Sequence, residues 1–120
     1  MNEYVGTLFQ SRTQTHIFHL QTSSYAKHIA LNEYYEEIVD LIDSLVEAYQ
    51  GKYEILKGYK MVESLKDLES EDDIVSYLEK VAKYCELKRE KLPQDGFLTN
   101  IYDDIDTLLR STIYKLKRLG

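Results

Sequence analysis

Apolar residues recur every three or four positions along most of the chain, the spacing that places side chains on one face of a helix. Residues 3–20 carry one such stripe, and residues 25–49 carry a wider one. The four polar residues between them, 21–24, predict a break, in which the hydroxyl of Ser24 accepts a backbone N–H and caps the second helix. The first half of the chain therefore predicts two helices joined by a short turn.

The middle of the chain is less regular. Gly51 is the expected end of the second helix, because glycine is favoured just beyond a helix C-terminus. Residues 52–69 mix apolar and polar positions without a sustained period, and they predict either one short helix or a packed loop.

Two further helices are expected in the second half. Ser70 and Asp73 have the spacing of a capping box, which predicts a third helix that starts near this point and runs to residue 92. After a tight connection at 93–96, residues 98–116 again carry apolar side chains on one helical face. Four helices with short connections predict an all-α protein, a four-helix bundle that forms a single domain over residues 1–120.

The composition fits a small globular protein. Of 120 residues, 43% are hydrophobic and one is proline, which favours long helices over a sheet-rich fold. No apolar run approaches the roughly 18 residues of a membrane span, and the N-terminus lacks the basic and apolar regions of a secretory signal. Cys85 is the only cysteine, so no internal disulfide can form, which suits a reducing compartment. We therefore expect a cytoplasmic protein without a membrane anchor.

The net charge of −6 is unevenly placed. Between His28 and Lys52 the sequence has six acidic residues and no Lys or Arg. A net-negative chain is not steered toward phosphate backbones, so nucleic acid is an unlikely partner. The basic residues near the end of the last helix are explained by the helix dipole. The six acids are Glu33, Glu36, Glu37, Asp40, Asp43 and Glu47.

Four residues on the first two predicted helices have metal-ligand chemistry in an ordered spacing. His28 follows His16 by twelve positions, Asp43 follows His28 by fifteen, and Glu47 follows Asp43 by four. Residues four apart share one helix face, so the two carboxylates project together. Imidazole combined with carboxylate suits iron, zinc or manganese. His19 is an alternative to His16 as the first ligand.

The stretch THIFHLQTSSYAKHIALNEYYEEIVDLIDSLVEA resembles the ferroxidase region of the Dps mini-ferritins. Their pattern of His, His, Asp and Glu matches His16, His28, Asp43 and Glu47 residue by residue. The resemblance implies a ferritin-like bundle in which residues 52–69 cross over between the second and third helices, which then run parallel. It also implies that the histidines of one subunit face the carboxylates of a two-fold mate, that iron(II) is oxidised between them, and that the subunits form a hollow dodecamer.

The match is local, since it covers residues 12–51 well and the remainder only in helix order. The family usually has Trp after the first histidine, whereas this chain has Ile17 and no Trp at all. The family's glycine-containing break is replaced by 21–24, and no basic N-terminal tail is present. The chain also looks similar to small phage-encoded proteins of unassigned function, for which the compartment would be the host cytoplasm.

Other residues could support such a site. Glu36 and Asp40 form a second pair four residues apart, and they are candidates for the outer shell of the metal or for solvated surface acids. The eleven tyrosines are expected mainly to pack in the core and at interfaces. Cys85, within an apolar stripe, is expected to be inert. No catalytic residue apart from the metal ligands and no organic cofactor is expected.

Two functions follow from these observations. The first is an iron-binding oligomer with a possible ferroxidase or storage activity, at least a homodimer through the first two helices, because an acidic stripe beside an apolar face is tolerable when a mate brings histidines and a cation against it. The second is a redox-inactive ferritin-like protein with a structural or interaction role, such as a viral accessory or virion protein.

Overall fold

The computed structural model describes residues 1–61 and 63–119 and contains helices but no strand within them. Four helices follow one another along the chain, so the expected all-α fold is confirmed. None of them is both long enough and apolar enough to cross a bilayer, as far as the described residues go. The helices are α1 (Asn2–Gln21), α2 (Tyr25–Lys52), α3 (Asp72–Arg89) and α4 (Gly96–Arg118).

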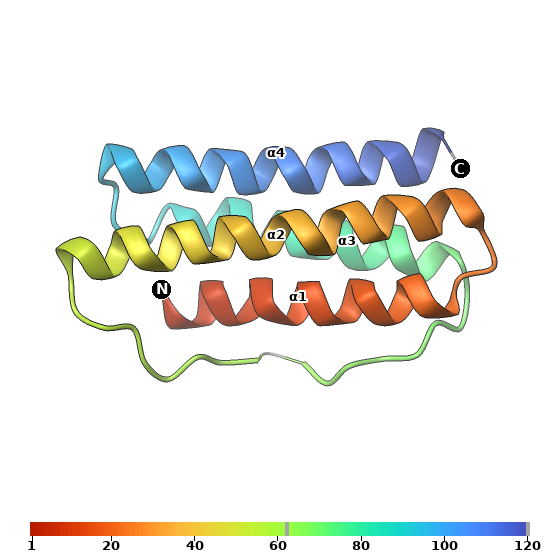
Figure 1. Cartoon of the computed structure of the whole chain (residues 1–120), viewed down its shortest axis with the longest axis horizontal. Coiled ribbons are helices and arrows are strands. Elements are labelled where there is room, and N and C mark those ends of the chain that lie inside the picture. The colour runs from red at the N-terminus through yellow and green to blue at the C-terminus, as the bar shows by residue number, and fades with distance from the viewer. Residues whose placement is uncertain (62, 120) are drawn as a thin grey trace.

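The helices pack side by side in a bundle of 44 × 26 × 22 Å. α2 packs against α1 and α4, and α3 packs against α4 and α1. Figure 1 shows that α1 and α2 run in opposite directions, whereas α2 and α3 run in the same direction. The chain between α2 and α3 must therefore return along the length of the bundle, and in Figure 1 it does so on the outer side of α1.

The core is formed by apolar side chains from all four helices, together with three fully buried tyrosines, Tyr4, Tyr34 and Tyr102. The Tyr34 hydroxyl shares a hydrogen bond of 2.7 Å with the buried hydroxyl of Ser11, and the Tyr102 hydroxyl donates to a backbone carbonyl. The packing role expected of the tyrosines is confirmed for these three. Burial of a large aromatic surface with a bonded hydroxyl stabilises the junctions between helices.

The helix boundaries agree with the sequence expectations at most ends. Ser24 caps α2 by accepting the N–H of Lys27 at 3.2 Å, as predicted. The prediction that Gly51 lies beyond the helix was wrong, because α2 continues to Lys52 and Tyr53 donates its N–H to the Tyr49 carbonyl. Among the described residues, only Gly58 has a positive φ, at 71°. The helix continues because nothing in its last turn opposes helical geometry.

Residues 53–71, which we call the strap, form an extended segment. The strap has no helix within its described residues, so the expectation of a short helix was wrong and that of a packed loop holds; residue 62 lies outside the described part. Its apolar side chains are too dispersed to build a buried helical face: Ile55, Tyr59, Met61 and Leu65 are all exposed.

The strap is attached to α1 by side-chain amides that bind its backbone. Gln10 donates to the carbonyl of Glu63 at 2.6 Å and accepts its N–H at 3.3 Å. Gln14 forms the same reciprocal pair with Lys66, with both distances 2.8 Å. Near the end, Gln21 accepts the N–H of Leu68 at 2.7 Å. These pairs satisfy backbone groups that would otherwise depend on water.

The amide-bearing residues share one face of α1 with a glycine. Asn2, Gly6, Gln10, Gln14 and Gln21, which we call the amide stripe, follow one another at intervals of four or seven. A Cβ at Gly6 would lie 1.9 Å from the backbone oxygen of Lys60, so only glycine allows the strap this close. The amide stripe explains why α1 has two polar, well-buried glutamines, Gln10 and Gln14, beside its apolar residues.

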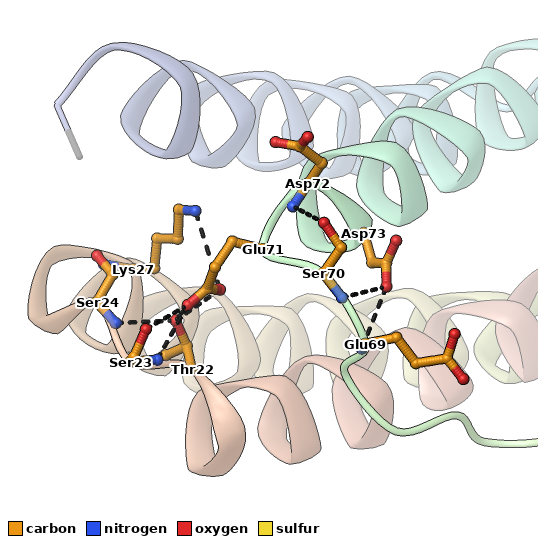
Figure 2. Close-up of polar contacts among 9 residues, drawn as sticks. All are labelled: Thr22, Ser23, Ser24, Lys27, Glu69, Ser70, Glu71, Asp72 and Asp73. Atoms are coloured by element: carbon orange, nitrogen blue, oxygen red, sulfur yellow. Dashed lines mark hydrogen bonds and ion pairs between the residues drawn. The ribbon is translucent and has the colours of Figure 1, made fainter.

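The final residue of the strap, Glu71, is bound by the turn between α1 and α2 (Figure 2). Its carboxylate accepts hydrogen bonds from the Thr22 hydroxyl at 2.8 and 2.9 Å and from the Ser23 backbone at 3.0 Å. Lys27 lies 3.9 Å away. Burial raises the pKa of Glu71, but the hydrogen bonds from Thr22 and Ser23 outweigh it and hold the pKa below its usual value.

The predicted capping box lies beside this contact. The Asp73 carboxylate accepts the Ser70 backbone N–H at 2.9 Å, which is the reciprocal half of such a box. The Ser70 hydroxyl accepts only a long hydrogen bond of 3.4 Å, from the backbone N–H of Asp72. The serine half of the predicted box is therefore only weakly formed. α3 begins at Asp72, between the two residues of the predicted box, so the expected start of this helix is confirmed.

We expect Glu71→Gln to lower the free energy of unfolding by about 1 kcal/mol at neutral pH, because an ionised acceptor is replaced by a neutral one. Since the folded pKa of Glu71 is depressed, its contribution is present above the unfolded pKa of about 4.5 and is lost as the pH falls through the folded pKa. Urea unfolding at pH 7 and pH 3 measures the difference. Glu69→Gln is the matched control, because the Glu69 side chain points away from this contact in Figure 2; equal effects of the two variants would contradict the assignment.

Candidate metal site

The three histidines of the chain lie together where α1 ends and α2 begins. The rings of His19 and His28 are stacked, with centroids 3.7 Å apart and an interplanar angle of 18°. The His16 ring lies edge-on to His19 at 5.9 Å. The turn at 22–24 folds α2 back onto α1, which brings His19 and His28, nine positions apart, into contact.

His19 and His28 bind each other's backbone. The Nδ1 of His19 lies 2.7 Å from the carbonyl oxygen of His28, and the Nδ1 of His28 lies 2.9 Å from the carbonyl oxygen of His19. A carbonyl can only accept, so we assign the ring hydrogen to Nδ1 in both residues, which leaves each Nε2 with a lone pair. Metal-binding histidines are commonly held in this way by a bond from the other ring nitrogen to a carbonyl.

His16 is held by a different contact. Its ring stacks on Tyr35 of α2, with centroids 4.3 Å apart and an angle of 16°, and the Tyr35 hydroxyl donates to Asn32 at 2.6 Å. His16 and His28 are half-buried, whereas His19 is only 8% exposed. His19 thus lies between the other two and is the least accessible of the three to an ion.

The carboxylates of the predicted site are exposed on α2. Asp43 and Glu47 make no ion pair within the described residues, and the same holds for Glu36 and Asp40. Only Glu33 of the α2 acids has a cationic partner there, Lys115 of α4 at 2.9 Å. The acidic face expected from the sequence is therefore present and is largely uncompensated within one chain.

One chain does not bring the histidines and carboxylates together. Fifteen residues separate His28 from Asp43, which corresponds to about 22 Å along a helix. Within the described residues, no group of three or more His, Cys, Asp or Glu side chains is close enough to hold a metal ion. Each chain therefore carries two half-sites, a histidine half at one end of α2 and a carboxylate half toward the other.

Cys85 lies elsewhere, in the buried interior of α3. Burial is the main cause that raises the pKa of its thiol to about 12, and the nearby charge of Asp106 adds to it. A thiol that stays protonated at neutral pH is a poor nucleophile and a poor metal ligand, in keeping with the inert role expected of it.

Sequence reasoning missed a partly buried polar cluster near Cys85. Arg89 of α3 donates to Asp106 of α4 at 2.8 Å and lies over the ring of Tyr102 at 5.6 Å. One oxygen of Asp106 and the Tyr4 hydroxyl are buried and have no hydrogen-bond partner among the described residues. Burial is the main cause that raises the pKa of Asp106. The signal in the sequence was an Asp within the apolar stripe of the last helix.

Comparison with known proteins gives a family without an assigned activity. A model described as "Family of unknown function (DUF5856)" matches residues 19–116, a span that contains His19, His28, Asp43 and Glu47 but not His16. The chain is also similar to the "Uncharacterized 14.6 kDa protein in mobD-ri intergenic region" of Enterobacteria phage T4, with 27% identity over 116 residues, 96% of this chain and 86% of that protein. No solved structure matches the chain. Similarity to a phage protein was expected; neither match names a ferritin or Dps protein, so that resemblance stays a prediction.

Proposed function

The chain belongs to DUF5856, a family of unknown function, and we propose that it is a Dps-like, oligomeric metal-binding protein that holds iron between two subunits. The observation that carries the proposal is a pair of complementary half-sites. His16 at the end of α1 and His28 at the beginning of α2 are half-buried, and His28 keeps a lone pair on Nε2. The unpaired carboxylates of Asp43 and Glu47 begin about 22 Å further along α2. Neither half is a complete site, and their separation fits a site built from two chains.

An antiparallel two-fold pairing of α2 helices would complete both halves at once. In such a dimer, His28 of one chain faces the region of Asp43 and Glu47 of the other, and the axis lies near the midpoint of the helix. The same operation produces a second, identical site. The exposed face of α2 between these points carries Glu36 and Asp40, which would then border the two sites. We propose a homodimer through α1 and α2 as the minimal assembly and a dodecamer as its full form.

The donor set fits the proposed ion. Two imidazole nitrogens and two carboxylates suit iron(II), and zinc or manganese in its place. His16 and His28 would supply the nitrogens, Asp43 and Glu47 would anchor the ion, and His19 would orient His28 through their reciprocal hydrogen bonds. Iron is the substrate in this proposal, and its oxidation to iron(III), with dioxygen accepting one electron from each ion, would lead to storage or detoxification.

The direction of the helices and the long connection between α2 and α3 also support the proposal. A long connection that leaves α2 and α3 running in the same direction is the connectivity of a ferritin-like bundle, and the strap would be its crossover (Figure 1). If the protein acts within an infected cell, as its similarity to a phage T4 protein suggests, its compartment would be the host cytoplasm.

A second candidate is a structural or interaction protein without metal chemistry. The observation in its favour is that packing alone accounts for the histidines: His16 stacks on Tyr35, and His19 and His28 satisfy each other. In this case the acidic face of α2 would serve assembly or a partner protein. The two candidates differ in whether purified protein binds iron(II) at a fixed stoichiometry.

Anaerobic titration with iron(II), followed by addition of oxygen, tests the proposal. We expect wild type to bind one ion per chain, since a dimer has two sites. We expect the double variant Asp43→Ala, Glu47→Ala to bind iron(II) at least about 100-fold more weakly than wild type, because both carboxylate ligands are lost.

A matched control removes the same charge elsewhere. Glu54→Ala, Glu90→Ala changes two exposed carboxylates that have no ion pair within the described residues. The control should bind iron as wild type does. If the Asp43, Glu47 variant also binds and oxidises iron as wild type does, the proposed site is wrong; if wild type binds no iron, the second candidate is favoured.

A further inference from the structure

A groove runs between α2 and α4. It has a volume of about 370 Å³, and its apolar lining comes from Leu41 and Leu108. Glu37 and Asp40 border it from α2, and Asp104 borders it from α4. The groove is therefore apolar along its floor and acidic along both rims.

The acidic rims have no cationic partner in the chain. Glu37, Asp40 and Asp104 are exposed and take part in no ion pair within the described residues. By contrast, Glu33 of α2 and Glu79 of α3 are paired with Lys115 and Lys117 of α4. The local lysines are thus already engaged, and the rims of the groove stay negative.

The strap presents the opposite chemistry along an exposed stretch, residues 57–61. Lys57 and Lys60 are exposed and make no ion pair within the described residues. Between and beside them, Tyr59 is 45% exposed and Met61 is 59% exposed. This stretch is therefore cationic and apolar, which complements an acidic groove with an apolar floor.

The stretch is also held in a fixed conformation. Lys60 donates its backbone N–H to the Asn2 carbonyl, Asn2 donates its side-chain amide to the Lys57 carbonyl, and the Tyr59 ring packs edge-on against Phe9 at 5.7 Å. Gly6 admits the backbone of Lys60 at close range. A segment ordered in advance loses little conformational entropy when it binds.

We propose that residues 57–61 of one copy dock into the α2–α4 groove of a second copy. Lys57 and Lys60 pair with the acidic rims, while Tyr59 and Met61 cover the apolar floor. The contact uses two different surfaces of the same chain, and Figure 1 shows the strap and α4 on opposite sides of the bundle. It is therefore a head-to-tail contact, which builds a ring if its rotation closes and a filament if it does not.

This contact shares only Asp40 with the border of the two-fold site proposed above. It involves neither His16, His28, Asp43 nor Glu47, and it needs no metal. It would join dimers into a larger assembly, and it would also form between chains that bind no iron.

Light scattering of the full chain in EDTA tests the contact. We expect wild type at low salt to have a mass above that of a dimer and to lose it at 0.5 M NaCl, where exposed charge pairs are screened. Lys57→Glu, Lys60→Glu should weaken the association at least tenfold at low salt. The control Lys83→Glu, Lys91→Glu makes the same charge change at exposed lysines with no ion pair in the described part, and it should assemble as wild type does.

Charge exchange between two chains gives the decisive result. Glu37→Lys, Asp104→Lys makes the groove cationic, and Asp40 is left unchanged because it lies near the proposed metal ligands. We expect each double variant alone to be no larger than a dimer, and an equal mixture of the groove and strap variants to regain the larger mass. Wild type no larger than a dimer in EDTA, a strap variant that assembles like its control, or a mixture that does not assemble would each overturn the proposal. Iron binding by the strap variant, measured separately, reports on the two-fold site alone.

Discussion

We expect Gly6→Ala to lower the free energy of unfolding by about 2–4 kcal/mol, although alanine is the better helix former. The new Cβ would lie 1.9 Å from the oxygen, 2.7 Å from the carbon and 2.8 Å from the nitrogen of Lys60. All three are backbone atoms, so no side-chain rotation relieves the overlap. The strap must move away from α1, and its amide pairs with Gln10 and Gln14 are strained or lost with it.

Gly51→Ala is the matched control, because nothing lies within 4 Å of a Cβ at that helical position. It should be neutral or stabilising by up to about 1 kcal/mol. Thermal melts of both variants measure stability, and limited trypsin digestion at Lys57, Lys60 and Lys66 reports whether the strap is released. Equal melting temperatures and equal digestion of Gly6→Ala and wild type would show that the strap is not held at this point.

The helices were predictable because their apolar positions repeat at a single period. α4 is the clearest case: its buried residues, from Leu98 to Leu116, follow the stripe seen in the sequence. The cap at Ser24 was equally local, since one hydroxyl and one backbone N–H three residues away decide it. The helix end near Gly51 could not be predicted in the same way, because whether a glycine ends a helix depends on the conformation of the chain that follows.

The strap could not be predicted, because its conformation is determined by residues some fifty positions away. Gln10 and Gln14 resemble ordinary surface residues until a second backbone lies beside them. The only signal in the sequence was the amide stripe of α1. It cannot be interpreted without knowing that the strap lies beside it. A short helix was therefore as consistent with residues 52–69 as the extended form.

The proposed donors of the candidate site could be named from the sequence, but their arrangement in space could not. The spacing of His16, His28, Asp43 and Glu47 identified donors of the right chemistry, and the structure places the two histidines in one cluster with His19 between them. The tautomers could not be read from the sequence, because they depend on contacts with the His19 and His28 carbonyls across the turn. The separation of about 22 Å does follow from helix geometry, and it is what makes the proposal depend on a second chain.

The need for ligands from two chains predicts a second large effect, on iron binding. In a site shared between chains, His16→Ala, His28→Ala and Asp43→Ala, Glu47→Ala should each abolish high-affinity iron binding when every chain carries the change. Co-refolding the two variants in equal amounts should restore it in part. In each mixed dimer, the intact histidines of one chain face the intact carboxylates of the other, and the second site lacks all four ligands.

If the chains pair at random, half of the dimers are mixed and each has one of two sites, so the mixture should bind about one quarter of the wild-type amount of iron. The restored sites should have wild-type affinity, because every ligand in them is native. Anaerobic iron(II) titration gives the amount and the affinity, and native mass spectrometry counts the mixed dimers. A site within one chain predicts no recovery, since no chain in the mixture has all four ligands. Mixed dimers that bind no more iron than the parent variants would therefore rule out a shared site, whereas recovery at about one quarter can be explained only by ligands from two chains.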